Sequence, residues 1–147
     1  MTAVLASSMP LAASARAQDS ETKATLEQLP AAVQDAVKAQ GRGATLRRVA
    51  KELKGGVTQY EAELMVDGRR RDVLFDAQGK VVSVEEQKTL SEIPQGARDA
   101  ILKALGAGKL VLVEEVTKGE ATFYEGHISN GGNISEVKVD AAGKPVE

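Results

Sequence analysis

The chain contains no cysteine and a single histidine, His127, among its 147 residues. These absences exclude a disulfide framework, a thiol nucleophile and a zinc site of the usual composition. The net charge of −2 gives no basic field that would neutralise a phosphate backbone, so general nucleic-acid binding is disfavoured. Only two tyrosines and two phenylalanines are present, yet 42% of the residues are hydrophobic, which is typical of a folded globular protein.

The N-terminus carries a short apolar run at residues 4–13, followed by Ala15-Arg16-Ala17, the small-x-small pattern that signal peptidase accepts. We therefore predict a signal peptide over residues 1–17, a flexible segment over residues 18–24, and a periplasmic or secreted protein. The run is too short to span a bilayer as a helix. Met1 and Thr2 precede the run without a lysine or arginine, which indicates a weak signal or a translation start upstream of Met1. The alternative is an alanine- and serine-rich N-terminus of a cytosolic protein.

An internal repeat organises the rest of the chain. When the sequence is shifted by 64 positions, residues 25–83 align without a gap to residues 89–147, and 19 of the 59 pairs are identical. We call these segments the first and second copy. The first copy carries ten basic and eight acidic side chains and the second carries six and nine, a mild complementarity that could dock one copy on the other or form a head-to-tail dimer.

Each copy begins with an amphipathic pattern that follows a proline and ends at glycine, which predicts helices over residues 30–40 and 94–105. Alternating patterns then predict strands at residues 44–53, 57–66, 70–75 and 80–85, and at 109–116, 121–129, 134–139 and 144–147. The expected fold is therefore α+β, with two tandem repeats that each pack one helix on an antiparallel β-meander of about four strands. Residues 84–88 would be a short linker between them.

Three motifs carry a resemblance to a known family. A Leu-Pro pair at residues 29–30, a Tyr-Glu-x-x-Leu strand at 60–64 and an Asp-x-x-Gly-Lys turn at 76–80 resemble the PepSY-like family of bacterial secreted proteins. The second copy departs from the pattern at Gly126-His127, where the first has Ala62-Glu63. The resemblance implies a PepSY-like repeat at 25–83 and another at 89–147, an architecture similar to beta-lactamase inhibitory protein, and a non-enzymatic module of a kind associated with protease propeptides and with the inhibition or escort of hydrolases.

The candidate binding residues lie on strands. If the sheet faces away from the helices, its outward side chains form the natural recognition surface, and an arginine triplet after the turn at residues 67–68 could hold a carboxylate-bearing partner. Charged residues on an exposed edge strand would equally protect the sheet from pairing with its neighbours. The predicted partner-binding residues are Glu61, Glu63, Met65, Arg69, Arg70, Arg71, Glu125 and His127.

Catalytic, cofactor and metal sites are not predicted. Adjacent acidic residues such as Glu114-Glu115 and Glu85-Glu86 point to opposite faces of a strand and do not converge on one bond. The turns that begin at Asp76 and Asp140 lack the alternating oxygen ligands of a calcium loop. The sequence thus predicts a monomeric or weakly dimeric protein that binds no nucleic acid but binds another envelope or extracellular protein, with a hydrolase as the candidate partner. The alternative is a periplasmic protein that binds a small ligand or ion between the repeats.

Overall fold

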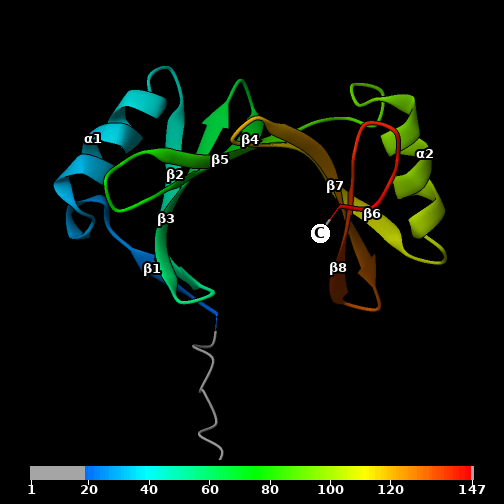
Figure 1. Ribbon diagram of the computed structural model, residues 1–147, viewed down its shortest axis with the longest axis horizontal. Helices are drawn as coiled ribbons and strands as arrows, with labels where there is room; N and C mark the ends of the chain where they lie inside the picture. The colour runs from blue at the N-terminus through cyan, green and yellow to red at the C-terminus, as the bar shows by residue number, and fades with distance from the viewer. Residues whose placement is uncertain (1–18, 147) are drawn as a thin grey trace, which may run out of the picture.

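The computed structural model describes residues 19–146, in which the strands form one antiparallel sheet in chain order (Figure 1). The predicted signal peptide lies outside the described residues. The eight strands are β1 (Ser20–Ala24), β2 (Thr45–Lys54), β3 (Val57–Val66), β4 (Arg69–Phe75), β5 (Val81–Gln87), β6 (Lys109–Lys118), β7 (Ala121–Asn130) and β8 (Asn133–Val139).

The prediction of two tandem helix-plus-meander units is wrong, because the strands of both copies belong to a single sheet. The predicted linker at residues 84–88 falls largely within β5, which pairs with β6 through Glu85↔Val116 and Glu86↔Glu115. The segment expected to be flexible, residues 18–24, contains β1, which pairs with β2. Unpaired strand edges carry unsatisfied backbone groups, so joining β5 to β6 leaves one sheet with two edges in place of two sheets with four.

Two helices among the described residues cover one face of this sheet, α1 (Ala31–Gln40) near its β1 end and α2 (Gln95–Ala104) near its β8 end (Figure 1). Each begins directly after proline, where the missing N–H costs nothing, so the predicted positions of the helices are confirmed. Two separate apolar clusters form beneath them. The first contains Val33, Val37, Leu64, Val73 and Phe75, and the second contains Ala97, Ile101, Val113, Tyr124 and Val139.

A turn after β4 and an equivalent turn after β8 hold the two helices against the sheet. Gly79 and Gly143 adopt φ values of +78° and +83°, and a Cβ at either position would collide with the backbone carbonyl of Ala32 or Gly96. In each turn one aspartate oxygen accepts two backbone N–H groups at 2.9 Å, which explains the repeated Asp-Ala-x-Gly-Lys sequence. The strand expected after the second turn is reduced to a single bridge between Val139 and Pro145.

Neither helix in the described part of the chain is long and apolar enough to cross a membrane. Both helices pack on the same face of the sheet, so no layer formed by residues 19–146 covers the opposite face. This uncovered face is the concave side of the arch in Figure 1.

Candidate functional site

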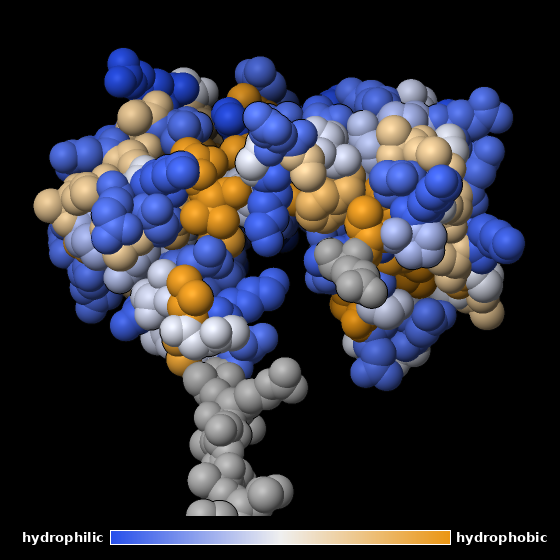
Figure 2. All heavy atoms as spheres, in the orientation of Figure 1, coloured by the Kyte–Doolittle hydropathy of each residue, from blue (hydrophilic) through white to orange (hydrophobic). Residues whose placement is uncertain are grey.

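The concave face of the sheet gathers most of the charged side chains that the strands contribute. Side chains alternate along a strand, so the residues beside each core position point away from the helices. Figure 2 shows hydrophilic side chains reaching into the notch between the two ends of the sheet. The strand registers place the following on this face: Glu21, Lys23, Arg48, Glu52, Lys54, Glu61, Glu63, Met65, Arg70, Asp72, Glu85, Glu114, Lys118, Glu125, His127, Glu136 and Lys138.

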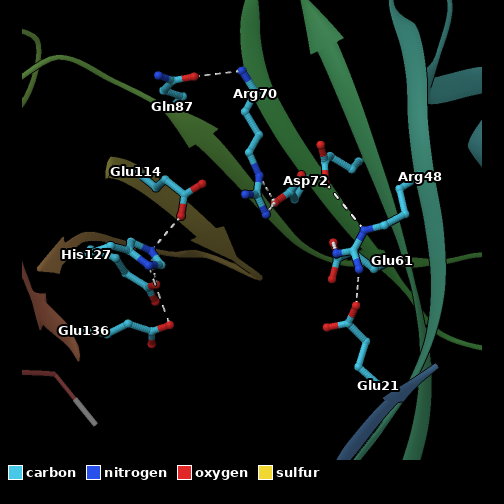
Figure 3. Close-up of polar contacts among 11 residues, drawn as sticks. Glu21, Arg48, Glu61, Arg70, Asp72, Gln87, Glu114, His127 and Glu136 are labelled. Carbon is cyan, nitrogen blue, oxygen red and sulfur yellow. Dashed lines mark hydrogen bonds and ion pairs between the residues drawn. The ribbon is translucent and has the colours of Figure 1, made fainter. Parts of the chain in front are cut away.

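Arg48 organises the β1–β3 end of the concave face (Figure 3). Its guanidinium pairs with Glu21, lies 3.1 Å from a carboxylate oxygen of Glu61 and 3.6 Å from one of Glu63. Burial, reinforced by the neighbouring carboxyl of Glu52, raises the pKa of Glu61 to about 7. One cation therefore serves several carboxyls, and this end of the face holds an excess of acid.

The side chains of the arginine triplet divide between the two faces of the sheet, although all three residues line one hollow beside the turn at residues 67–68. Arg70 points to the concave face and donates to Asp72 Oδ2 at 2.6 Å, whereas Arg69 and Arg71 point to the other face. Arg69 pairs with Glu92 and Arg71 with Glu86. Edge protection does not explain the triplet either, because β4 lies inside the sheet between β3 and β5.

His127 lies on β7 among three carboxyl groups (Figure 3). Its Nε2 is 3.0 Å from Glu114 Oε2, and atoms of its ring lie 3.9 Å from Glu125 and from Glu136. The hydrogen bond with Glu114 raises the pKa of His127 above its usual value although burial opposes the shift. Its side chain is only 19% exposed, so His127 belongs to a half-buried polar cluster on this face.

A hollow of about 210 Å³ lies in the concave face and is lined by strands from both copies. Five carboxyl groups and three lysines line it, the former being Glu52, Glu61, Asp72, Glu85 and Glu125. Burial raises the pKa of Glu85 to about 7, and the nearby charge of Glu114 adds to the effect. Acid groups thus outnumber bases in the hollow, which suits a cationic ligand or a basic surface.

Several sets of three side chains on this face could hold a metal ion, with ligand atoms within 4.8 Å of one another. The sets are Glu21, Glu52 and Glu61; Glu61, Glu63 and Asp72; Asp72, Glu85 and Glu114; and Glu114, Glu125 and His127. In the last set Glu114 and Glu125 already bind internal partners, His127 and Lys138. The sets run across the sheet from β1 to β7, so the acid on this face is a continuous band.

The sequence patterns placed Glu61, Glu63, Met65, Glu125 and His127 together on one face, and the strand registers give the same placement. The patterns missed Asp72, Glu85 and Glu114, which meet only because β4, β5 and β6 are neighbours. The sequence did contain a pattern that places these acids on the concave face, since each of them lies next to a buried or core-facing residue in its strand. Acidic pairs within one strand do diverge, but acids on adjacent strands of one face converge.

Comparisons with known proteins identify solved structures that share this fold. No family model and no curated protein matches the sequence. A BLIP-like protein from Bacteroides fragilis is 22% identical over 79% of this chain and 82% of its own, with a TM-score of 0.55. A DUF2874 family protein from Bacteroides ovatus is 16% identical over 82% and 86%, with a TM-score of 0.61.

A further structure, from Bacteroides eggerthii and provisionally assigned to the periplasm by its name, is 17% identical over 81% and 86%, with a TM-score of 0.62. At these identities the likeness defines the fold, which is that of the BLIP-like and DUF2874 proteins. Membership of the PepSY-like family stays a prediction from the sequence motifs.

Proposed function

We propose that this chain is a non-enzymatic protein-binding module of the periplasm or of the secreted fraction, and that the concave face of its sheet binds a partner with basic side chains. The observation that carries the proposal is the band of carboxyl groups across a sheet face that no other layer of the described chain covers. The export signal predicted from the sequence, and the names of the BLIP-like and periplasmic structures with the same fold, support the compartment.

The charge on this face favours a basic partner over an acidic one. Lys23, Lys54 and Lys118 form no ion pair within the described chain, but nine carboxyl groups outnumber the six lysines and arginines of this face. Arg48, Arg70 and Lys138 are each paired with carboxylates of the chain itself, so they are poorly placed to attract an anion. Several carboxyl groups share these cations, so part of the negative charge of the face remains for a basic partner to neutralise. Charge complementarity of this kind raises the association rate and makes binding sensitive to salt. Whether such a partner is a hydrolase that the module inhibits or escorts is the finer part of the proposal.

The test is capture of envelope and culture-supernatant proteins on the immobilised protein, followed by titration calorimetry with the purified partner in the presence of EDTA. A concave-face variant, Glu61→Gln/Glu125→Gln, removes one carboxylate from each copy. A matched control, Asp35→Asn/Asp99→Asn, removes one carboxylate from each helix, where both side chains are exposed.

We expect a stoichiometric complex that weakens in the concave-face variant and with added salt, and that persists in the helix variant. Equal binding by both variants would place the interface elsewhere. If the captured partner is a hydrolase, its turnover with and without the module measures inhibition.

The alternative function, a protein that binds a small ligand or ion between the copies, is favoured by one observation, the hollow lined from both copies. A ligand that binds only the folded state should raise the melting temperature with its concentration. A thermal-shift screen of small cationic molecules therefore distinguishes this function from protein binding.

A further inference from the structure

Three carboxyl groups meet at the middle of the concave face, where the two copies join. Asp72 comes from β4, Glu85 from β5 and Glu114 from β6, and one ligand atom of each lies within 4.8 Å of the others. Asp72 is directly opposite Glu85 in the strand register. Three adjacent strands thus aim oxygen atoms at one point, an arrangement that neither copy could form alone.

Two of these carboxyl groups are buried with an oxygen that has no partner. Asp72 is 5% exposed and Glu114 is 1% exposed, and Asp72 Oδ1 and Glu114 Oε1 make no hydrogen bond within the described chain. Their other oxygens are fixed by Arg70 and His127. Figure 3 shows that the Glu114 oxygen not bound to His127 points toward Asp72. A buried acceptor without a partner is costly, so both atoms are poised for a ligand.

The charge at this point suits a divalent cation. The three carboxylates carry three negative charges when ionised, and Arg70 supplies one positive charge through Asp72. A divalent cation would neutralise the remainder, and oxygen ligands of this kind are those that Ca²⁺ and Mg²⁺ prefer. Among residues 19–146, no lysine or arginine forms an ion pair with Glu85, so no side chain of the described chain neutralises its charge.

The two copies differ at the position that completes the cluster. Glu114 aligns with Ala50, and the registers are equivalent, since Ala50 pairs with Glu61 and Glu114 pairs with Glu125. Ala50 is fully buried, so a small apolar side chain satisfies this position in the sheet. Packing therefore does not require a carboxyl group at residue 114. Its hydrogen bond with His127 accounts for Oε2 but leaves Oε1 without a partner.

We propose that Asp72, Glu85 and Glu114 bind a hard divalent cation of the Ca²⁺ and Mg²⁺ class, with water completing its coordination. The two buried residues would supply Asp72 Oδ1 and Glu114 Oε1 as ligands. The third ligand would come from the carboxyl group of Glu85, which is half-buried. The site does not rest on protein binding, although an ion here would lower the negative charge of the concave face.

The test uses the purified protein stripped with EDTA and then freed of chelator. CaCl₂ and MgCl₂ are titrated separately by calorimetry and by thermal shift, up to about 10 mM, above the range of weak extracellular calcium sites. NaCl at equal ionic strength is the control for screening. We expect one ion per chain for at least one of the two cations and a melting temperature that rises with its concentration.

Matched variants locate the ion. Glu85→Gln and Asp72→Asn keep the shape of the side chain and should lower the affinity by about tenfold or more, because each removes a charged ligand. Asp99→Asn removes an exposed carboxylate from α2, on the other side of the sheet, and should leave the affinity unchanged. Glu114→Ala, which copies Ala50, should stay folded in the absence of ions and lose the stabilisation by the cation.

Heats and melting temperatures that match those of the NaCl control for both cations would overturn the proposal. So would an affinity that falls in Asp99→Asn and not in Glu85→Gln. The protein-binding test is run in EDTA, so failure of the cation site leaves the outcome of that test independent.

Discussion

Gly126 on β7 lies directly beneath α2, and adding a single methyl group there should destabilise the fold. A Cβ built on Gly126 would lie 2.7 Å from Ile101 Cγ2, closer than a carbon pair can approach. Its φ lies outside the left-handed region, so alanine is excluded by space and not by backbone conformation. The first copy has Ala62 at this position with the smaller Val37 above it. A larger helix residue is thus matched by a smaller strand residue in the second copy.

The magnitude follows from two opposed effects. Overpacking a core by one methyl group costs about 1–3 kcal/mol, and replacing glycine within a strand returns about 0.5–1 kcal/mol of conformational entropy. Gly126→Ala should therefore lower the free energy of unfolding by about 1 kcal/mol, and by no more than about 2.5 kcal/mol. Ile101→Ala should cost about 2–5 kcal/mol, because Ile101 is fully buried and leaves a cavity.

The decisive measurement is the double variant, followed by urea denaturation with far-UV circular dichroism. In the Ile101→Ala background the clash is absent and the new methyl group partly fills the cavity, so Gly126→Ala should become neutral or stabilising. We expect a favourable coupling free energy of about 2 kcal/mol between the two substitutions. Additive effects, within about 0.5 kcal/mol, would refute the explanation of Gly126 by helix contact.

Three further predictions concern pH, a turn and a close approach. Burial raises the pKa of Glu61 from 4.5 to about 7, so the folded protein holds a proton there that the unfolded chain releases, and stability should fall as the pH rises from 4.5 to 7. Glu61→Gln should match the wild type in urea denaturation at acid pH and exceed it above pH 7; a constant difference across the pH range would contradict this. Asp140→Ala removes the acceptor of two backbone N–H groups and should lower the unfolding free energy by about 1–3 kcal/mol, whereas Asp140→Asn, which keeps an acceptor, should cost less. Gly79→Ala should lower the melting temperature more than Gly68→Ala, because both positions have positive φ but only a Cβ at Gly79 would meet the backbone of α1; equal losses would point to φ alone.

The local elements of this protein follow from short-range chemistry and were predictable. The prolines before residues 31 and 95, the glycine-containing turns and the alternation along the strands act within a few residues. The helices and nearly all strands therefore occur where the patterns place them. The same alternation put Glu61 and Glu63 on the face opposite the core, which the registers reproduce.

The sheet itself was not predictable from those patterns. A pattern of alternating hydrophobic residues predicts that one face of a strand is buried, but it does not predict which strand pairs with it. The sequence of residues 84–88 is compatible with a connection or with a strand. In the structure most of these residues belong to β5, because they pair with β6. Likewise β1 precedes both copies and has no repeat pattern to mark it, yet it pairs with β2 along its whole length.

The sequence alone determined the helix positions, the turn chemistry and the polar character of one face of the strands, because each depends on neighbours along the chain. Only the tertiary structure decided that eight strands form one curved sheet and that Asp72, Glu85 and Glu114 meet at its centre. Their convergence depends on the order of β4, β5 and β6 and on the register of their ladders, which bring together oxygens far apart in sequence. The burial that leaves two of those oxygens without partners likewise arises only when the sheet is assembled.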